Sequence, residues 1–285
     1  MKRNYFIVLF IILITSISLG YWITRTERYK NYRQLQYLES VVDTTLNEAG
    51  YEIDLESNYQ ILGYGMDIEG KGSYLKDNNT LYMNYLTKLN GKGVSPLTVE
   101  LNQYIDNQNN IQYMNLNRGQ WFKEPFNSSL TILNQIPAIF KNSKLKKSTQ
   151  KIEIVEGSEN TQILIFELPL NQSDFLTQQL IQNILNISDS INYDELIEES
   201  PNVSYTVTLN KQINQITSIK IDYTSGIQEL LVTLMNRYPE LFSLISLEEV
   251  KEMFFSTSID ISSSTSEVIL PSDVKLNAVQ ISDLK

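Results

Sequence analysis

Cysteine and histidine are both absent from this chain of 285 residues. Without cysteine there is no disulfide, no thiolate nucleophile and no cysteine-bound zinc or iron–sulfur cluster. Without histidine there is no imidazole base, no Ser-His-Asp triad and no histidine metal ligand. Catalysis would have to use carboxylates, lysine, hydroxyl groups or the backbone. No constellation of these groups in the sequence points to an enzyme, so we expect neither catalysis nor a cofactor.

Basic residues are scarce outside the N-terminal region. The formal net charge is −10 at pH 7, with 23 basic and 33 acidic residues. Residues 1–34 carry six basic residues and one acidic residue, which leaves a net charge of −15 on residues 35–285. So acidic a body repels a phosphate backbone, and we therefore exclude nucleic acid as a partner.

The N-terminal region holds one long hydrophobic run. Residues 5–23 are uncharged and mostly apolar, and their length approaches the roughly 20 residues that a helix needs to cross a bilayer. Lys2 and Arg3 precede the run, as basic residues do in a signal sequence. We predict a signal anchor over residues 1–25, which spans the cell membrane once and holds the C-terminal domain outside the cytoplasm.

Two features leave alternatives to this anchor. Ser18 and Gly20 place small residues where a signal peptidase would cleave, which would remove the segment. Four basic residues follow the run, from Arg25 to Arg33, and by the positive-inside rule they would keep the body in the cytoplasm. We favour the extracytoplasmic arrangement because no further hydrophobic span needs these charges for its orientation.

The rest of the chain has an α+β pattern. Apolar residues recur every three to four positions in residues 26–50, which predicts a juxtamembrane helix before an extracytoplasmic domain of residues 51–285. Short alternating segments joined by polar turns predict antiparallel strands in that domain. The predicted strands cover residues 59–68, 73–76, 80–89, 97–105, 111–116, 120–123, 151–155, 162–168, 203–209, 216–223, 254–261 and 267–270. The predicted helices cover residues 127–141, a segment from Ser173, and two segments that start with capping boxes of Ser225 with Gln228 and Ser246 with Glu249.

Four segments carry strand motifs that occur together in a known group of proteins. They are residues 80–86 (TLYMNYL), residues 117–123 (NRGQWFK), the hairpin of residues 203–221 and residues 268–278 (VILPSDVKLNA). In these motifs the chain resembles the LolA/LppX-like lipoprotein-carrier superfamily, especially its uncharacterised extracytoplasmic families of low-GC bacteria. The resemblance implies a curved antiparallel half-barrel sheet, with helices on its concave face and a cavity for an acyl chain or a hydrophobic peptide. The lipid-bearing cysteine usual in that superfamily is absent, so the N-terminal helix would have to replace it as the anchor.

Some predicted strands are apolar on both faces. In residues 80–89, Leu81, Met83, Tyr85 and Leu89 share one face, while Tyr82 and Leu86 lie on the other. Such strands need cover on both faces, or a ligand on one of them. A closed core and a core that opens into a lipid-sized cavity both remain open at this point. The candidate cavity-lining residues are Phe166, Leu176, Leu180, Ile184, Leu231 and Met235.

Other motifs lack residues that their chemistry needs. Residues 65–72 miss a phosphate-binding loop because Gly72 stands where serine or threonine would hold magnesium. The polar turn at residues 106–110 lacks the glycine and glutamate of a calcium loop. The acidic residues at 194–199 and the Ser-x-x-Lys spacings at 148–151 and 272–275 have no companion motifs. We interpret these segments as strand bends and solvated turns, and we predict no metal site.

The sequence therefore predicts a membrane-anchored, extracytoplasmic binding protein that holds a hydrophobic ligand or a protein partner in a half-barrel cavity. The expected partners are the membrane, through residues 5–23, and a lipid or an envelope protein. The alternative is a sensory or protein-interaction module of the cell envelope that binds no small molecule.

Overall fold

The computed structural model describes residues 27–126, 152–158, 160–169 and 202–284. The predicted membrane segment at residues 5–23, the predicted helix at 127–141, the helix predicted from Ser173 and the acidic residues at 194–199 lie outside these ranges. Within the described ranges, no helix has both the length and the hydropathy that a membrane span requires.

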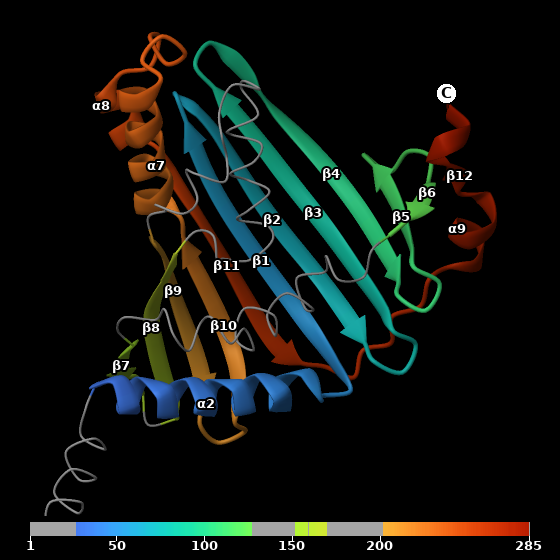
Figure 1. Ribbon diagram of the computed structural model, residues 1–285. Helices are drawn as coiled ribbons and strands as arrows, with labels where there is room; N and C mark the ends of the chain where they lie inside the picture. The colour runs from blue at the N-terminus through green and yellow to red at the C-terminus, as the bar shows by residue number, and fades with distance from the viewer. Residues whose placement is uncertain (1–26, 127–151, 159, 170–201, 285) are drawn as a thin grey trace, which may run out of the picture.

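One open, curved sheet dominates the described part of the chain (Figure 1). Its strands are β1 (Gly50–Ile61), β2 (Tyr64–Leu75), β3 (Thr80–Gly91), β4 (Val94–Asp106), β5 (Ile111–Leu116), β6 (Phe122–Pro125), β7 (Ile152–Glu156), β8 (Thr161–Pro169), β9 (Asn202–Asn210), β10 (Gln215–Asp222), β11 (Phe254–Ser263) and β12 (Val279–Gln280). Their order across the sheet is β12-β6-β5-β4-β3-β2-β1-β11-β10-β9-β8-β7. All neighbours pair antiparallel except β12, which runs parallel to β6. The predicted curved, mostly antiparallel sheet is thus confirmed.

The sheet has one apolar and one polar face because its strands alternate. In β9, the residues from Val203 to Leu209 alternate between buried apolar side chains and half-buried serine or threonine. The register continues this division across the sheet, since Val207 faces Ile219 of β10, which faces Ile259 of β11. Ile259 in turn faces Leu55 of β1. We call the side that bears these residues the apolar face, and the opposite side the polar face.

Two helices pack on the apolar face. Helix α2 (Glu27–Leu46) buries Leu38, Val41 and Val42, and its Thr45 hydroxyl accepts a hydrogen bond of 2.9 Å from the backbone N–H of Ile216. Helix α7 (Thr224–Arg237) buries the stripe Ile227, Leu230, Leu231 and Leu234 in the same core. Figure 1 shows α2 across the lower end of β8–β10 and α7 beside the upper end of β9 and β11. These helices therefore cover the β7–β11 half of the apolar face.

The C-terminal segment covers part of the polar face at the other edge of the sheet. The side-chain amide of Asn78, in the β2–β3 turn, donates a hydrogen bond to the carbonyl of Val268. Helix α9 (Ser272–Asn277) then packs Val274 against Tyr113 of β5, and the 3-10 helix η3 (Ile281–Leu284) ends the described chain. Apolar side chains on the polar face are thus covered where β4–β6 carry them.

The predicted strand over residues 59–68, with a break at Gly63 and Gly65, is two strands in the structure. The chain turns there, and β1 and β2 form a hairpin whose two-residue loop is Leu62 and Gly63. Both loop residues have positive φ, 51° and 82° respectively. Two residues in this conformation give the turn that matches the twist of paired strands. Strand β1 also begins at Gly50, so residues 50–58 are strand although no strand was predicted before residue 59.

Three smaller predictions also need correction. Helix α7 begins after Tyr223 without a side-chain cap, and Gln228 donates to the carbonyls of Lys251 and Met253 instead of closing a capping box with Ser225. Residues 267–270 form no strand, since β11 ends at Ser263 and no ladder follows before α9. The short strand predicted at residues 120–123 lies two residues later, as β6. By contrast, the capping box of Ser246 with Glu249 is confirmed at α8 (Leu247–Lys251).

Candidate functional site

Charged residues in β1–β5 all lie on the polar face. Alternation along each strand and the register between strands place them there. They are Glu52, Asp54, Glu56, Asp67, Glu69, Lys71, Lys88, Glu100 and Asp106. The apolar face of the same five strands therefore carries no formal charge among its described residues.

This uncharged face is only partly covered. Its side chains are buried where Leu81, Met83 and Ile105 lie, near the β2–β3 turn, and become exposed toward the β3–β4 turn. Leu89 is 37% exposed and faces Leu97 of β4, which is 54% exposed; Leu116 of β5 is 55% exposed. We call the set Met66, Ile68, Tyr85, Leu89, Leu97, Val99, Leu101, Met114 and Leu116 the open apolar surface. Large exposed apolar patches of this kind mark binding sites for hydrophobic partners or ligands.

Two glycines of β2 give space to the large side chains of β3. A Cβ on Gly72 would stand 2.1 Å from the Met83 sulfur and 2.3 Å from the Tyr82 carbonyl oxygen. A Cβ on Gly70 would stand 3.0 Å from the Tyr85 ring and 3.3 Å from the Leu55 Cβ. The side chains of Met83 and Tyr85 thus lie against β2, where any larger residue would displace them.

Tyr85 brings a hydroxyl group into this apolar setting. Burial raises the pKa of its phenol to about 12, because the ionised form would lose its hydration there. Its hydroxyl makes no hydrogen bond with another described residue. The open apolar surface therefore contains one polar group that has no protein partner in the described part of the chain.

The predicted cavity-lining residues lie elsewhere. Phe166 stacks on Tyr205, with ring centroids 5.4 Å apart and planes inclined by 4°, and is 2% exposed. Leu231 is buried in the same core, and Met235 packs against it half-buried. Leu176, Leu180 and Ile184 lie outside the described residues. The described three thus share a packed core, and their role as a lining stays a prediction.

Sequence reasoning identified one strand of the open apolar surface and missed the others. Tyr85 and Leu89 were recognised on an apolar face, but Met66, Val99 and Met114 were not. The signal was available in residues 97–101, where Leu97, Val99 and Leu101 alternate with polar residues. The sequence of each segment alone does not show which segments lie side by side in the sheet.

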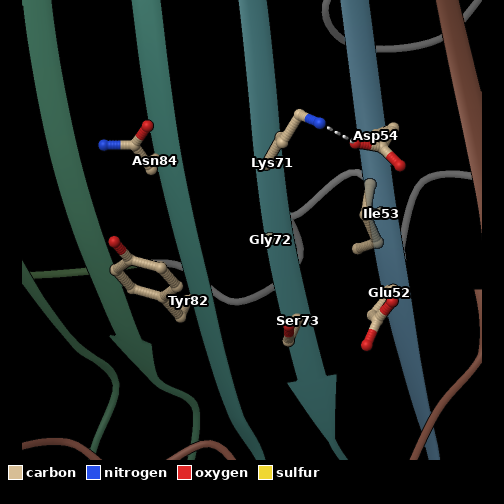
Figure 2. Close-up of a pocket in the computed structure, with 8 residues that line it drawn as sticks. All are labelled: Glu52, Ile53, Asp54, Lys71, Gly72, Ser73, Tyr82 and Asn84. Carbon is tan, nitrogen blue, oxygen red and sulfur yellow. Dashed lines mark ion pairs between the residues drawn. The ribbon is translucent and has the colours of Figure 1, made fainter. Parts of the chain in front are cut away.

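The polar face has a shallow hollow of about 310 Å³ over β1–β3. Figure 2 shows its lining, in which Glu52 and Asp54 of β1, Lys71 and Ser73 of β2, and Tyr82 and Asn84 of β3 project from the strands. The Lys71 ammonium pairs with Asp54 at 3.5 Å, and both side chains are more than half exposed. Glu52 accepts hydrogen bonds from the hydroxyls of Ser264 and Ser266, and Tyr82 donates to Asn102. The polar groups of the lining thus have partners within the hollow or beside it, and the hollow also includes Ile53 and Gly72.

The carboxylate in the β4–β5 turn stabilises that turn. Asp106 accepts hydrogen bonds of 3.0 Å from the backbone N–H and 2.7 Å from the side-chain amide of Asn109. Among the residues that the structure describes, no group of three acidic side chains is placed to hold a metal ion. Residues 65–72 run through β2, whose pairing with β1 and with β3 has no register shift, so no bulge interrupts the strand at these glycines.

Comparison with known proteins gives structural likeness without sequence similarity. No family model matches the chain, and no curated protein matches its sequence. LprF from Mycobacterium bovis is similar in structure, with a TM-score of 0.42 and 9% identity, over 84% of this chain and 95% of that one. The lipoprotein LppX from Mycobacterium tuberculosis gives a TM-score of 0.40 and 9% identity, over 83% of this chain and 97% of that one.

Proposed function

We propose that the chain is a membrane-anchored, extracytoplasmic binding protein that sequesters a hydrophobic ligand on its half-barrel sheet. The observation that carries the proposal is the open apolar surface, an uncharged area on β2–β5 whose leucines remain up to about half exposed. Sequestration needs only apolar contact, so it suits a chain without histidine or cysteine. A lipid or acyl chain is the ligand that this surface fits best.

Apolar contact alone is sufficient to bind such a ligand. Burial of one methylene group contributes about 0.8 kcal/mol. An acyl chain of about ten methylene groups would gain roughly 8 kcal/mol before the cost of ordering the ligand is subtracted. Tight binding therefore requires contact along most of the acyl chain, which a surface spread over four strands can provide.

The location is part of the same proposal. Residues 5–23 would hold the protein in the membrane, with the sheet outside the cytoplasm, and the anchor would then keep the binding surface close to a source of lipid. A reporter domain fused after Lys285, active only outside the cytoplasm, tests this orientation. Activity of the reporter is expected, and an inactive but expressed fusion would place the sheet in the cytoplasm.

Leu97 and Thr98 provide a matched test of ligand binding. They are neighbours on β4, both are exposed, and they lie on opposite faces of the sheet. We expect Leu97→Asp to lower the binding of a photoactivatable alkane probe to the full chain at least about tenfold, because the substitution removes a leucine contact and adds a charge. Thr98→Asp adds the same charge to the polar face and should leave binding unchanged.

The outcome separates the proposal from its alternative. If the delipidated full chain binds no alkane probe saturably, or if both variants bind equally well, the carrier function is wrong. The open apolar surface would then be better explained as the contact of a protein-interaction module.

A further inference from the structure

A cluster of hydroxyl groups lies inside the apolar face between β1 and β11. The hydroxyl of Thr257 lies 3.0 Å from that of Ser57 and 3.2 Å from that of Tyr59. Ser57 and Thr257 are each only 4% exposed. Their neighbours on the same face are apolar, with Leu55 and Ile68 beside Ser57. A polar cluster in this setting must find its hydrogen-bond partners locally.

The cluster has more donors than its own contacts can use. Three hydroxyl groups carry three protons, and the two contacts between them use two of these protons. The third O–H therefore has no acceptor within the cluster, and none among the other described residues. Because Ser57 and Thr257 are buried and Tyr59 is only half-buried, the Tyr59 hydroxyl is the donor of this cluster that a group on the apolar face can reach.

Tyr85 supplies a second available donor nearby. Its ring lies against Gly70, on the side where Gly70 approaches Leu55 of β1. Ser57 of β1 faces Ile68 of β2, which faces Thr87 of β3, two residues from Tyr85. Neighbouring strands are about 4.8 Å apart, so the region of the apolar face from β11 to β3 that holds the cluster and Tyr85 is about 14 Å wide across the strands. A tyrosine phenol keeps its proton at neutral pH, so the Tyr85 hydroxyl can donate.

The absence of charge on this face limits what these donors can bind. Described residues of β1–β5 offer no cation on the apolar side, so a carboxylate or phosphate there would be a buried charge without a partner. The body also carries a net charge of −15, which disfavours an anion. An uncharged carbonyl oxygen suits this face, because it can accept a hydrogen bond from these donors and carries no charge.

We propose that the ligand is a neutral acyl ester or amide, whose carbonyl oxygen accepts a hydrogen bond from the Tyr85 hydroxyl while its acyl chain lies on the open apolar surface; the cluster of Ser57, Tyr59 and Thr257 is a second donor in the same region. This inference rests on the proposed function and narrows it to one class of lipid. Free fatty acids in their ionised form and other anionic lipids are excluded from the site.

The inference is tested with three photoactivatable probes that share a twelve-carbon tail: a glycerol ester, the free acid at pH 9 and the plain alkane. Each probe is added to the full-length protein in phosphatidylcholine vesicles. Labelling of peptides from β2–β5 is normalised to labelling of the vesicle lipid, and 0.5 M salt screens the net charge of the body. We expect the ester to label at least about fivefold more than the acid. Tyr85→Phe should reduce ester labelling about two- to tenfold, the worth of one net hydrogen bond, and leave alkane labelling unchanged.

Tyr82→Phe is the matched control, since Tyr82 lies on the same strand and points to the polar face. It should not change labelling by any probe. If the alkane labels β2–β5 but ester and acid label equally, or if Tyr85→Phe and Tyr82→Phe have the same effect, the assignment of a neutral ester is overturned while the carrier function stands. If not even the alkane labels these strands, both proposals fail. The comparison of ester with acid uses the unmodified chain, so it decides the question even if a variant does not fold.

Discussion

Replacement of Gly72 by alanine probes the packing of β2 against β3 beneath the open apolar surface. The added methyl group would stand 2.1 Å from the Met83 sulfur and 2.3 Å from the Tyr82 carbonyl oxygen. The sulfur can move because it ends a flexible side chain, but the carbonyl belongs to the paired strand and can move only with the backbone. Met83 is also 2% exposed, so its displaced side chain has no free space to enter.

The expected cost follows from this geometry. Adding a methyl group to a packed site commonly destabilises a protein by about 1–3 kcal/mol, and a clash with the backbone places Gly72→Ala in the upper part of that range. Gly65→Ala is the control on the same strand, because a Cβ there has its nearest contact at 3.8 Å. That substitution should be neutral or stabilise by up to about 1 kcal/mol, since alanine restricts the unfolded chain.

Urea unfolding of the full chain, followed by the circular dichroism of the sheet, measures both effects. The account predicts a lower midpoint for Gly72→Ala with an unchanged slope, and no decrease for Gly65→Ala. Equal midpoints for the two variants would refute the packing described here. In a Met83→Ala background, the further loss caused by Gly72→Ala should be smaller but not zero, because the contact with the Tyr82 carbonyl remains.

Two further predictions concern local features of the fold. Ser246→Ala removes the side chain that caps α8 and should lower stability by about 0.5–2 kcal/mol, whereas Ser225→Ala, at a position without a cap, should change it little; thermal unfolding of the two variants checks this, and equal losses would contradict it. The pKa of Tyr85 is raised to about 12 from 10.0, so above pH 10 the unfolded chain loses this proton before the folded chain does. The contribution of Tyr85 to the free energy of unfolding should therefore be constant below pH 10 and fall as the pH rises toward 12. The Tyr85→Phe variant should lose less stability over this range. An identical pH dependence of urea midpoints in the two proteins would show that Tyr85 is not desolvated.

Local patterns in the sequence predicted most of the strands. Alternation in residues 203–209 identifies β9, and the polar turns at residues 77–79 and 106–110 identify the hairpins on either side of them. These features were predictable because each depends on a few adjacent residues. The capping box of Ser246 with Glu249 was predictable for the same reason.

Features that depend on distant contacts were not predictable in this way. Gly63 marks a break in residues 59–68, but leucine is an unusual residue at positive φ, so the sequence does not show that Leu62 and Gly63 form a complete hairpin turn. The apolar residues at 267–270 suggested a strand, but Val268 is buried without strand pairing, and its backbone carbonyl accepts a hydrogen bond from Asn78 in the β2–β3 turn, 190 residues earlier in the chain. A short run of apolar residues can therefore also occur where one side chain is buried and the segment pairs with no strand.

The candidate site shows the same limit. Alternation places Tyr85 and Leu89 on one face of their strand, but not next to a particular neighbour. The register that sets Leu89 opposite Leu97, and the exposure of both, come from the assembled sheet. The hydroxyl cluster is still less visible in the sequence, because Ser57 and Thr257 are 200 residues apart.

The central claim is that a hydrophobic ligand lies on β2–β5, on the face opposite the charged residues. Labelling of the full chain with a photoactivatable alkane, followed by mass spectrometry of its peptides, locates the contact to individual residues. The account predicts adducts on the odd-numbered residues of β4, Leu97, Val99 and Leu101, and none on their neighbours Thr98, Glu100 and Asn102. Adducts distributed over both sets, or found only in residues 5–23, would contradict it.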